Sequence, residues 1–526
     1  MPTSFEVRLS EDNAQKGATF EDVLKQTGEF GTYQIRLFII ITLMDITTGQ
    51  CMSYFVFSNS NPGWRCARYQ GSNTTFNETT NFTADACVFN GTKCVEFEFS
   101  PELKSITTEW SLVCDQGYLP KMTVSIQMAG VLVGALTSGQ VGDTFGRRKT
   151  LIAMASLMMV LQIVVGFSNS WQLYAVLRFF VGMATAGTLN ISNTLPMEFI
   201  GAKYRTFCSS LGVYSMGNMM MALMAYLMRD WRYLAVAIGV IEFPILIAIL
   251  WGCPESVRWL LQRGRLQEAE DIVKQMAKVN KRSTPDLAIL KVIAQGNKEL
   301  KKREKQYSYH DLFRTRKMGA RTAVLLFTWF TASLVTYGIS NMYDTLEWSV
   351  YLSVVINHST SMLFGWTVIY TAERFGRRKS YLAYMTIPVV CMVTVALMGA
   401  LDVTSPDLLT TMVLLAVGGI IACWGISTIH VSELFPTLTR IIGMGACSVA
   451  ARIGGILAPQ VAYLGEFSHW AVPYIFYGTF CIMSAALVFF VLPETQGEPL
   501  PENMPARKDS THRADVRASW MWSSQN

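Results

Sequence analysis

The sequence predicts an all-α protein that crosses a membrane many times. Of its 526 residues, 51% are hydrophobic and only 16% are charged, whereas an ordinary soluble protein carries about 25% charge. The mean hydropathy is +0.28. The apolar residues form blocks of about 20 residues, long enough to cross a hydrocarbon core of about 30 Å. These blocks exclude a soluble enzyme, a disordered scaffold and a fibrous protein. Because the blocks do not alternate with polar residues, they also exclude an outer-membrane barrel.

Twelve apolar segments are expected to form membrane helices. They lie near residues 34–57, 121–142, 150–168, 171–195, 206–228, 233–252, 322–342, 347–371, 380–399, 408–430, 440–463 and 470–492. The polar and acidic first 30 residues lack the pattern of a signal peptide, so the first segment is expected to remain as a helix. The chain then divides into an N-terminal segment 1–33, a six-helix bundle 34–252, a linker 253–321, a second six-helix bundle 322–492 and a tail 493–526.

The distribution of basic residues predicts on which side each loop lies. Residues 254–321 contain 17 Lys or Arg and 8 Asp or Glu, whereas residues 58–119 contain 4 and 7. The short turns after the second and eighth segments, 147–149 and 377–379, both read Arg-Arg-Lys and fall on the same side as the basic linker. We therefore expect the linker and both termini in the cytoplasm, and loop 58–120 outside the cell.

Loop 58–120 has the pattern of a glycosylated, disulfide-bonded segment. Four N-glycosylation sequons cluster in it, at Asn73, Asn77, Asn81 and Asn90. Disulfides persist outside the cell, and the loop holds Cys66, Cys87, Cys94 and Cys114. Four cysteines allow three connectivities, of which we favour the interleaved one, Cys66–Cys94 with Cys87–Cys114. Cys51 is a candidate fifth member, and the other cysteines are expected to pack as small apolar residues.

Three local signatures recur in the same order in the two halves of the chain. The turn after the second segment contains Gly139, Asp143, Gly146, Arg147 and Arg148, and the turn after the eighth contains Glu373, Gly376, Arg377 and Arg378. Glu198 and Arg205 close the fourth segment as Glu433 and Arg440 close the tenth, at the same spacing. Pro254-Glu255-Ser256 follows the sixth segment as Pro493-Glu494-Thr495 follows the twelfth. Such a parallel repeat is typical of major facilitator transporters, which bind substrate between the halves.

Further motifs resemble solute carrier family 22 of the major facilitator superfamily. They are Thr108-Glu-Trp110, Arg229-Asp-Trp231-Arg232, Pro254-Glu-Ser-Val-Arg258 and Glu433-Leu-Phe-Pro436. The resemblance covers residues 20–503 and is strongest to the organic cation/carnitine branch. It implies a twelve-helix major facilitator fold and a multi-pass plasma-membrane carrier that works by alternating access. An Asn linked to sodium coupling in that branch corresponds to Thr48 here, so the coupling ion, sodium or a proton, stays open.

Two charged residues in the apolar segments are candidates to bind substrate, since intramembrane charges are costly and usually functional. Arg452, in the eleventh segment, can pair with a substrate carboxylate. By resemblance, the true organic-cation branch has an Asp here, and the anion and zwitterion branches have an Arg. Asp45, in the first segment, is the nearest candidate for an ammonium group. The alternatives are that Arg452 is satisfied by a helix carbonyl or by Asp45. Glu242 is expected to be a helix-packing or snorkelling carboxylate.

Aromatic rings can bind a quaternary ammonium group through their faces. Trp329, Phe330 and Tyr337 match pocket positions of the family. Tyr214, in the fifth segment, and Trp424, in the tenth, are similar candidates, although most of the 62 aromatic residues must serve packing. Gln127 and Asn357 are polar positions that either face the cavity or form hydrogen bonds between helices.

The repeated charges at the segment ends are expected to gate the inner side. Salt bridges among them would hold that side shut and would break as the halves rock, which switches the carrier between two states. The alternative is simple anchoring by basic residues. No metal cluster, catalytic triad or Walker sequence is visible, so neither an enzyme nor a pump is supported.

The expected substrate is a small organic ion, most plausibly a zwitterion such as carnitine or a related betaine. An organic-anion/dicarboxylate exchanger that uses Arg452 alone, and a transport-dead receptor or scaffold, are the alternatives. We expect no cofactor, no bound metal and no nucleic-acid partner. Membrane lipid surrounds the chain, and a monomer is expected to suffice for function.

Overall fold

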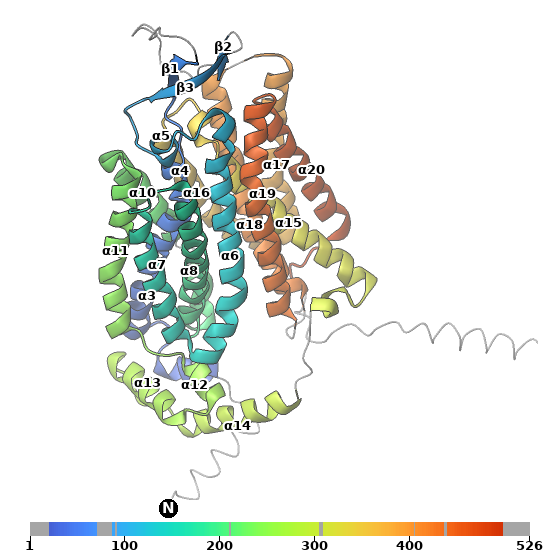
Figure 1. The fold of residues 1–526 in the computed structure, drawn as a ribbon. Coiled ribbons are helices and arrows are strands. Elements are labelled where there is room, and N and C mark those ends of the chain that lie inside the picture. The colour runs from blue at the N-terminus through green and yellow to red at the C-terminus, as the bar shows by residue number, and fades with distance from the viewer. Residues whose placement is uncertain are drawn as a thin grey trace, which may run out of the picture.

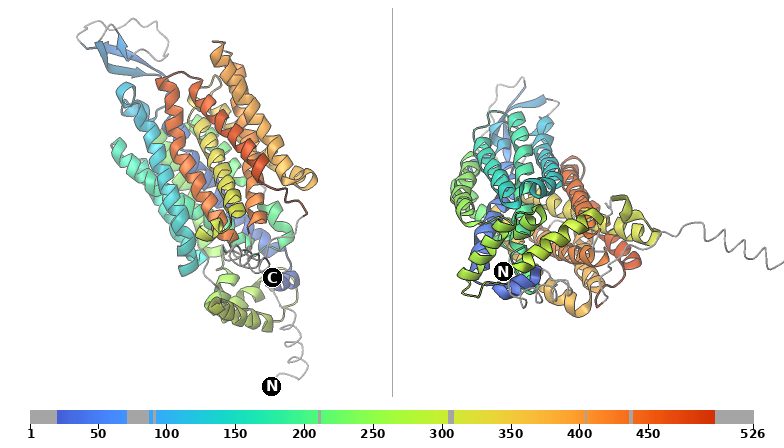
Figure 2. Two further views of the ribbon diagram at one scale, coloured as in Figure 1. Left: turned by 90° about the vertical axis from the view of Figure 1, so that its right-hand side faces the viewer. Right: turned by 90° about the horizontal axis from the view of Figure 1, so that it is seen from below.

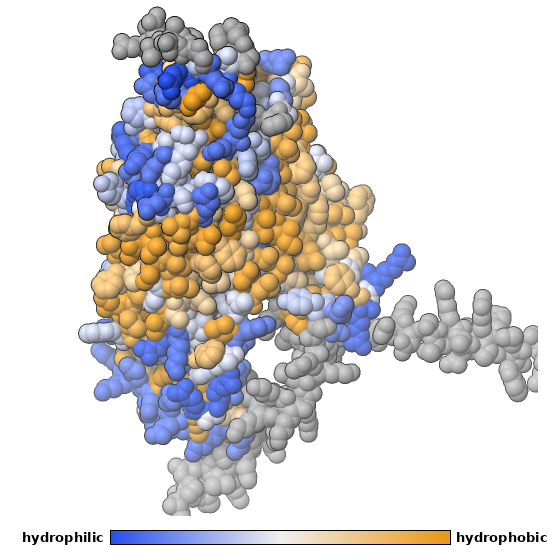
Figure 3. Space-filling view, viewed as in Figure 1, coloured by the Kyte–Doolittle hydropathy of each residue, from blue (hydrophilic) through white to orange (hydrophobic). Residues whose placement is uncertain are grey.

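Long helices running side by side make up most of the structure (Figure 1). This is a computed structural model, which describes residues 20–70, 87–89, 92–209, 212–303, 309–403, 405–435 and 439–497. A broad belt of apolar side chains covers the middle of the surface, between polar surfaces at the two ends (Figure 3). A bundle that crosses a bilayer has this distribution because its middle contacts hydrocarbon and its ends contact water and headgroups.

The six helices of each half are present. The first half contains α3 (Thr32–Ser53) with its short continuation α4 (Phe55–Ser58), α6 (Tyr118–Phe145), α7 (Arg147–Val165), α8 (Trp171–Met197), α10 (Val213–Met228) and α11 (Trp231–Gly252). The second contains α15 (Arg316–Ser340), α16 (Val350–Phe375), α17 (Arg377–Ala400), α18 (Pro406–Leu434), α19 (Arg440–Phe467) and α20 (Val472–Val491). Within the described residues, 11 spans are long and apolar enough to cross a membrane, and α10 is a shorter apolar helix. The predicted twelve helices are therefore confirmed.

Glycines divide the helices at the repeated turns. Gly146 separates α6 from α7 with φ +107°, and Gly376 separates α16 from α17 with φ +96°. Residues with a Cβ rarely adopt such angles, which explains why a glycine stands at the same place in both halves. Other helices start at side-chain caps: Ser170 accepts the backbone N–H of Leu173 at the start of α8, in the way that N-cap residues satisfy free amides.

A small sheet covers one end of the bundle, which we call the sheet end (Figure 1). It is antiparallel, and its strands β1 (Trp64–Tyr69), β2 (Val88–Phe89) and β3 (Thr92–Phe99) are arranged in the order β1-β3-β2. Disulfides join Cys66 to Cys94 and Cys87 to Cys114, which confirms the interleaved connectivity. The four sequons lie outside the described residues.

Cys51 was wrongly expected as a fifth disulfide candidate. It is buried inside α3 and is free, and the four cysteines of the loop already pair with one another. A disulfide needs two Cβ atoms about 3.5–4.5 Å apart, so a cysteine held within a membrane helix has no partner in the sheet.

A short helix below the sheet, α5 (Ile106–Glu109), fastens the loop to α11. The Glu109 carboxylate accepts hydrogen bonds from Arg232 Nη2 at 2.6 Å and from Trp231 Nε1 at 3.0 Å. The rings of Trp110 and Trp231 meet edge to face at 5.5 Å. Burial by itself raises the pKa of the Glu109 carboxyl, but the bonds from Arg232 and Trp231 and the nearby positive charges bring that pKa below its usual value. The two family motifs around Trp110 and Trp231 therefore meet as one clamp.

Linker helices lie at the opposite end, which we call the basic end (Figures 1 and 2). They are α12 (Val257–Arg263), α13 (Leu266–Val279) and α14 (Ala288–Arg303), beside the N-terminal helix α2 (Phe20–Thr27). Asn280 links these elements, because its Nδ2 donates to the Thr27 carbonyl at 2.9 Å and to Gln34 Oε1 at 2.8 Å, and its Oδ1 accepts the Tyr33 N–H at 2.9 Å. α13 is amphipathic, since Ala269, Val273, Met276 and Ala277 are buried on one side of it.

Candidate functional site

Asp45 lies within α3 at the centre of the bundle. Its side chain is 9% exposed, and one carboxylate oxygen accepts a hydrogen bond of 2.7 Å from Ser192 Oγ of α8. A buried carboxylate is costly unless its oxygens are bonded. A single hydroxyl leaves capacity for a further donor or a cation.

Tyr214 lies between Asp45 and the second half. A Cβ added to Gly49, one turn above Asp45, would come within 2.7 Å of the Tyr214 carbonyl, so glycine permits α10 to approach α3 here. The Tyr214 hydroxyl interacts with the Asn218 side chain of the same helix and lies within electrostatic range of Tyr337, Arg452 and Asp45. The structure therefore brings an acid of the first half and a base of the second half toward the same tyrosine.

Arg452 is half-buried within α19, and its Nε has no hydrogen-bond partner in the described part of the chain. Gly455 lies about one turn further along α19, next to both halves of the bundle. A Cβ at this position would lie 3.4 Å from the Tyr337 ring of α15 and 3.5 Å from Met128 Sδ of α6. Arg452 consequently lies on a face of α19 near the junction of the halves. Buried donors are normally bonded, so this guanidinium has capacity for water or a ligand.

The predicted aromatic residues do not all lie together. Trp329, which is 8% exposed, meets Trp424 edge to face at 6.0 Å, and its Nε1 has no partner among the described residues. Phe330 instead packs with Phe327 and Phe480, at 6.4 and 5.8 Å between ring centroids. Trp329 and Trp424 thus form a ring pair in the second half, whereas Phe330 belongs to a phenylalanine cluster between α15 and α20.

Asn357 lies in α16 and is 4% exposed. Its Oδ1 has no partner in the part of the chain that the structure describes, while its backbone carbonyl accepts the Ser361 hydroxyl at 2.7 Å. The side chain therefore retains an acceptor in the interior of the second half.

Arg178 of α8 is a buried cation that the sequence interpretation missed. It is 1% exposed and donates to Gln162 Oε1 at 3.1 Å, the Cys51 carbonyl at 3.0 Å and Gln127 Oε1 at 2.6 Å. Its guanidinium also lies 4.8 Å from the Tyr54 ring centroid. The signal was present as an arginine inside an apolar segment. Gln127 is thus engaged in joining helices of the first half.

Glu242 of α11 is also buried in the first half. It is 0% exposed, and neither of its carboxylate oxygens has a partner within the described residues. Both Glu242 and Arg178 lie within electrostatic range of Cys51. Glu242 therefore faces the interior of the half and does not snorkel to the membrane surface.

The repeated charges at the basic end pair within each half. Arg147 contacts Glu198 at 3.6 Å and also bonds Asp143, and Arg377 contacts Glu433 at 2.9 Å. The Arg147 pairs hold α6, α7 and α8 together. In the second half the Arg377–Glu433 pair joins α17 to α18, and Arg377 Nη1 donates to the Ala372 carbonyl of α16 at 3.0 Å. In this state, the pairs stabilise each half separately.

The glutamates of the third repeated signature cap the helices that follow the turns. Glu255 Oε1 accepts the Arg148 N–H at 3.0 Å, and Glu494 Oε1 accepts the Arg377 N–H at 2.7 Å. Acidic groups are favourable at helix N-termini, where amides are free. Burial by itself raises the pKa of the Glu494 carboxyl, but backbone N–H groups, first that of Arg377, bring it below its usual value.

Other predicted gating residues have different neighbours. Arg205 pairs with Glu21 of α2 at 2.6 Å. The Glu373 carbonyl accepts the side-chain amide of Gln496. Arg440 has two nitrogens without a partner among the described residues, and a Cβ at Gly139 would meet nothing within 4 Å. The sequence spacing alone therefore does not identify the partners.

Most of the named contacts that join the halves lie toward the sheet end. Lys121 Nζ donates to the Asn341 carbonyl at 2.8 Å, and Ser125 Oγ donates to the Ile456 carbonyl at 2.7 Å. The Phe57 and Tyr351 rings stack at 5.5 Å. Lys121, Asn341, Phe57 and Tyr351 lie near the sheet end of their helices, whereas Ile456 lies near the middle of α19. Ser359 Oγ of α16 also contacts Met219 Sδ of α10 at 3.4 Å, near the middle of both helices. The two halves are therefore fastened to each other from the sheet end to about the middle of the bundle.

Two six-helix halves with the same topology and polar groups near their junction define a major facilitator carrier. The solved structure of the inward open xylose transporter XylE from E. coli has the same fold, with a TM-score of 0.65, 16% identity and coverage of 89% of this chain and 98% of that chain. Residues 75–505 match the family model for "Sugar (and other) transporter".

The chain belongs to solute carrier family 22. Human solute carrier family 22 member 13 is 32% identical over 93% of both chains. Human organic cation/carnitine transporter 2 is 28% identical, covering 92% of this chain and 93% of the relative, and a Drosophila melanogaster organic cation transporter protein is 29% identical over 92% and 94%. The protein is thus a multi-pass secondary transporter and not an enzyme.

Proposed function

We propose that the protein carries a small organic zwitterion, such as carnitine or a related betaine, across the plasma membrane. Arg452 would bind the carboxylate, while Asp45 and aromatic ring faces would bind the ammonium group. The observation that supports this assignment is the position of Tyr214, whose hydroxyl lies within electrostatic range of both Asp45 and Arg452. A substrate with one charge of each sign complements such a pair. The relatives named for organic cations and carnitine agree with this substrate class.

The transport cycle that we propose is a rocking of the two halves around this site. The linker 253–321 is basic, which favours placing the basic end in the cytoplasm. With that orientation, the contacts from Lys121 and Ser125 would close the outer side, and the described state would be an inward-facing one. The ion pairs Arg147–Glu198 and Arg377–Glu433 would keep each half rigid during the movement. Sodium or proton coupling stays a prediction.

A second candidate is an organic-anion exchanger that uses Arg452 alone. Two observations favour it. Within the described residues Arg452 forms no ion pair, whereas Asp45 is already bonded to Ser192. A monovalent anion could therefore bind Arg452 without using Asp45, and outward flux of a dicarboxylate would then drive uptake.

The test is uptake of radiolabelled carnitine in cells that express the chain, with and without sodium, beside an anion-uptake assay in dicarboxylate-loaded cells. We expect saturable carnitine uptake. Arg452→Ala should reduce it by about tenfold or more, since hydrogen bonds to charged groups contribute about 1.5–3 kcal/mol. Arg68→Ala is the matched control, because Arg68 is exposed on the sheet and pairs with exposed Glu96. Surface amounts are measured for each variant.

The outcomes separate the candidates. Carnitine uptake that survives in Arg452→Ala would contradict the zwitterion site. Anion uptake stimulated by internal dicarboxylate, without carnitine uptake, would establish the exchanger. Binding without any flux or counterflow would indicate a receptor.

A further inference from the structure

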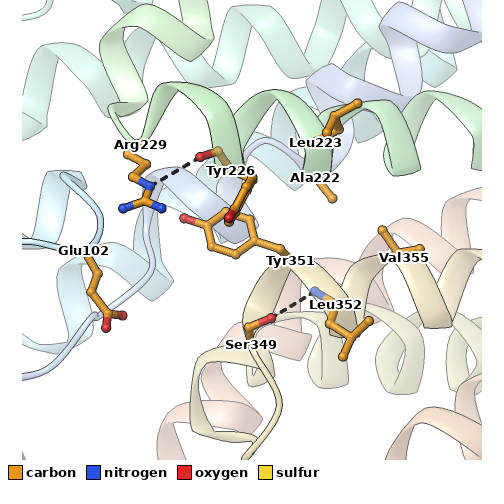
Figure 4. Close-up of a pocket in the computed structure, with 9 residues that line it drawn as sticks. All are labelled: Glu102, Ala222, Leu223, Tyr226, Arg229, Ser349, Tyr351, Leu352 and Val355. Atoms are coloured by element: carbon orange, nitrogen blue, oxygen red, sulfur yellow. Dashed lines mark hydrogen bonds between the residues drawn. The ribbon is translucent and has the colours of Figure 1, made fainter.

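A pocket lies between α10 and α16 at the sheet end (Figure 4). The residues that line it do not include Asp45 or Arg452. Its volume is about 490 Å³, within the range of about 300–1,000 Å³ for ligand pockets. It lies at the boundary of the two halves, because α10 belongs to the first half and α16 to the second. Tyr226 and Tyr351 stand between the two helices, where their rings meet edge to face at 5.5 Å.

One end of the pocket is polar and carries both signs of charge. Arg229 ends α10, and Glu102 comes from the loop below the sheet (Figure 4). The loop is held there because the Lys104 N–H donates to the Arg229 carbonyl at 2.9 Å. The Tyr351 side chain lies within electrostatic range of both Arg229 and Glu102. Within the described residues neither of these two charges forms an ion pair. Arg229 Nε donates to the Tyr226 carbonyl at 3.4 Å, and its guanidinium lies 5.4 Å from the Tyr226 ring centroid, which leaves its terminal nitrogens for a ligand.

The opposite end of the pocket is apolar and open. Leu223 and Val355 line it (Figure 4), and Leu352 lies in the first turn of α16. Leu223 is 60% exposed and Leu352 is 47% exposed, although both belong to helices of the membrane bundle. In a bilayer such exposed leucines face acyl chains. The pocket therefore extends from the headgroup level into the hydrocarbon.

We propose that this pocket binds a zwitterionic phospholipid from the leaflet at the sheet end. The Arg229 guanidinium would bind the phosphate, with the Ser349 hydroxyl as a further donor. The quaternary ammonium would lie between the Tyr351 ring and Glu102, because Arg229 already occupies the Tyr226 ring. The acyl chains would leave along Leu223 and Leu352. A soluble zwitterion matches the charges but leaves the apolar end facing lipid, whereas a phospholipid matches both ends.

The lipid would have a mechanical consequence, which goes beyond the proposed substrate. The walls of the pocket come from both halves, and Tyr351 also stacks on Phe57 of α4. A lipid seated between α10 and α16 therefore contacts both halves only while they are close at the sheet end. Its binding would favour that state over the state in which the halves separate there, because a ligand shifts an equilibrium by its differential affinity.

The experiment is photolabelling of the purified full chain in nanodiscs that contain phosphatidylcholine with a diazirine near the start of one acyl chain. Labelled peptides are mapped by mass spectrometry, without any transport assay. We expect label on peptides that contain Leu223 or Leu352. Replacing both rim charges, by Glu102→Gln with Arg229→Gln, should lower this label by about two- to fivefold for each charge, as for partly exposed charge contacts. Excess unlabelled phosphatidylcholine should compete.

The matched control is the double variant Glu96→Gln with Arg68→Gln, which removes an exposed ion pair of the same end, on the sheet. It should leave the label unchanged. A separate variant, Glu102→Lys, makes the rim positive and should move the preference from phosphatidylcholine to a phosphatidylglycerol probe. Label that is unchanged in the Glu102/Arg229 variant would overturn the proposal. Displacement by soluble glycerophosphocholine at the concentration at which the lipid competes would also overturn it, since the pocket would then be a solute site.

Discussion

Arg377 and Glu433 form an ion pair of 2.9 Å that reproduces, in the second half, the contact of Arg147 with Glu198 in the first. The arginine that starts α7 and the arginine that starts α17 thus pair with the equivalent glutamates of the two halves. Glu494 and Glu255 add matching bonds to the first amides of α17 and α7. Within the residues that the structure describes, each half is fastened at its own basic end by pairs whose partners belong to the same half.

This arrangement predicts that Gly376→Ala destabilises the second half. The residue has φ +96°, and its new Cβ would come within 2.5 Å of Glu494 Oε2. With ψ 160°, this backbone conformation is essentially restricted to glycine and costs about 1–3 kcal/mol for a residue with a Cβ. The apparent Tm of the purified protein should fall. Gly365→Ala is the control, because a Cβ there meets nothing within 4 Å, and an equal loss of stability in both variants would refute the explanation.

Gln127→Leu should lower stability and leave substrate affinity unchanged. The substitution removes the acceptor that lies 2.6 Å from Arg178 Nη2, and a lost hydrogen bond to a buried charged group costs about 1.5–3 kcal/mol. The measurements are thermal unfolding and the KM of carnitine uptake. Gln140→Leu, at an exposed position of the same helix, should change neither quantity. A raised KM with normal stability would place Gln127 in the substrate site instead.

Tyr214→Phe should raise the KM for the transported zwitterion. The change removes only the hydroxyl, which lies within electrostatic range of Asp45 and Arg452. We expect this hydroxyl to form a hydrogen bond to one charge of the bound zwitterion, and such a bond is worth about 1.5–3 kcal/mol, or roughly tenfold or more in affinity. Kinetics of uptake, corrected for surface amount, measure the effect. Tyr233→Phe, on the exposed surface of α11, serves as the control, and similar kinetics for both variants would argue against a role of the Tyr214 hydroxyl.

The clamp at Glu109 predicts an acid-sensitive sheet end. The pKa of Glu109 is lower in the folded protein than its usual value because Arg232 and Trp231 bond the carboxylate. The ionised Glu109 carboxylate therefore contributes fully to the free energy of unfolding above the unfolded pKa of about 4.3. This contribution is lost as the pH falls through the lower pKa of the folded state. The apparent Tm of the wild type should decline more steeply below about pH 4.5 than that of Glu109→Gln. The exposed Glu96→Gln variant should retain the wild-type slope.

Much of the fold could be predicted because its signals are local. Apolar blocks of sufficient length define the helices, and the glycines at 146 and 376 mark turns that only a residue without a Cβ adopts easily. The connectivity of Cys66–Cys94 and Cys87–Cys114 was favoured over two others and is confirmed. Cys51 was misjudged because proximity along the chain says little about which side chains meet.

A twelve-helix carrier with two like halves could be predicted from the order of residues, because the length of the apolar blocks and the repeated motifs can be read without knowledge of packing. Which charges meet became clear from the packed bundle. Arg205 pairs with Glu21, and Gln127 accepts a hydrogen bond from Arg178, which the sequence interpretation missed. Asp45 and Arg452 both lie within electrostatic range of Tyr214. The physical reason is that a partner depends on the rotation and depth of helices that lie far apart along the chain, and these are set by packing across the whole bundle.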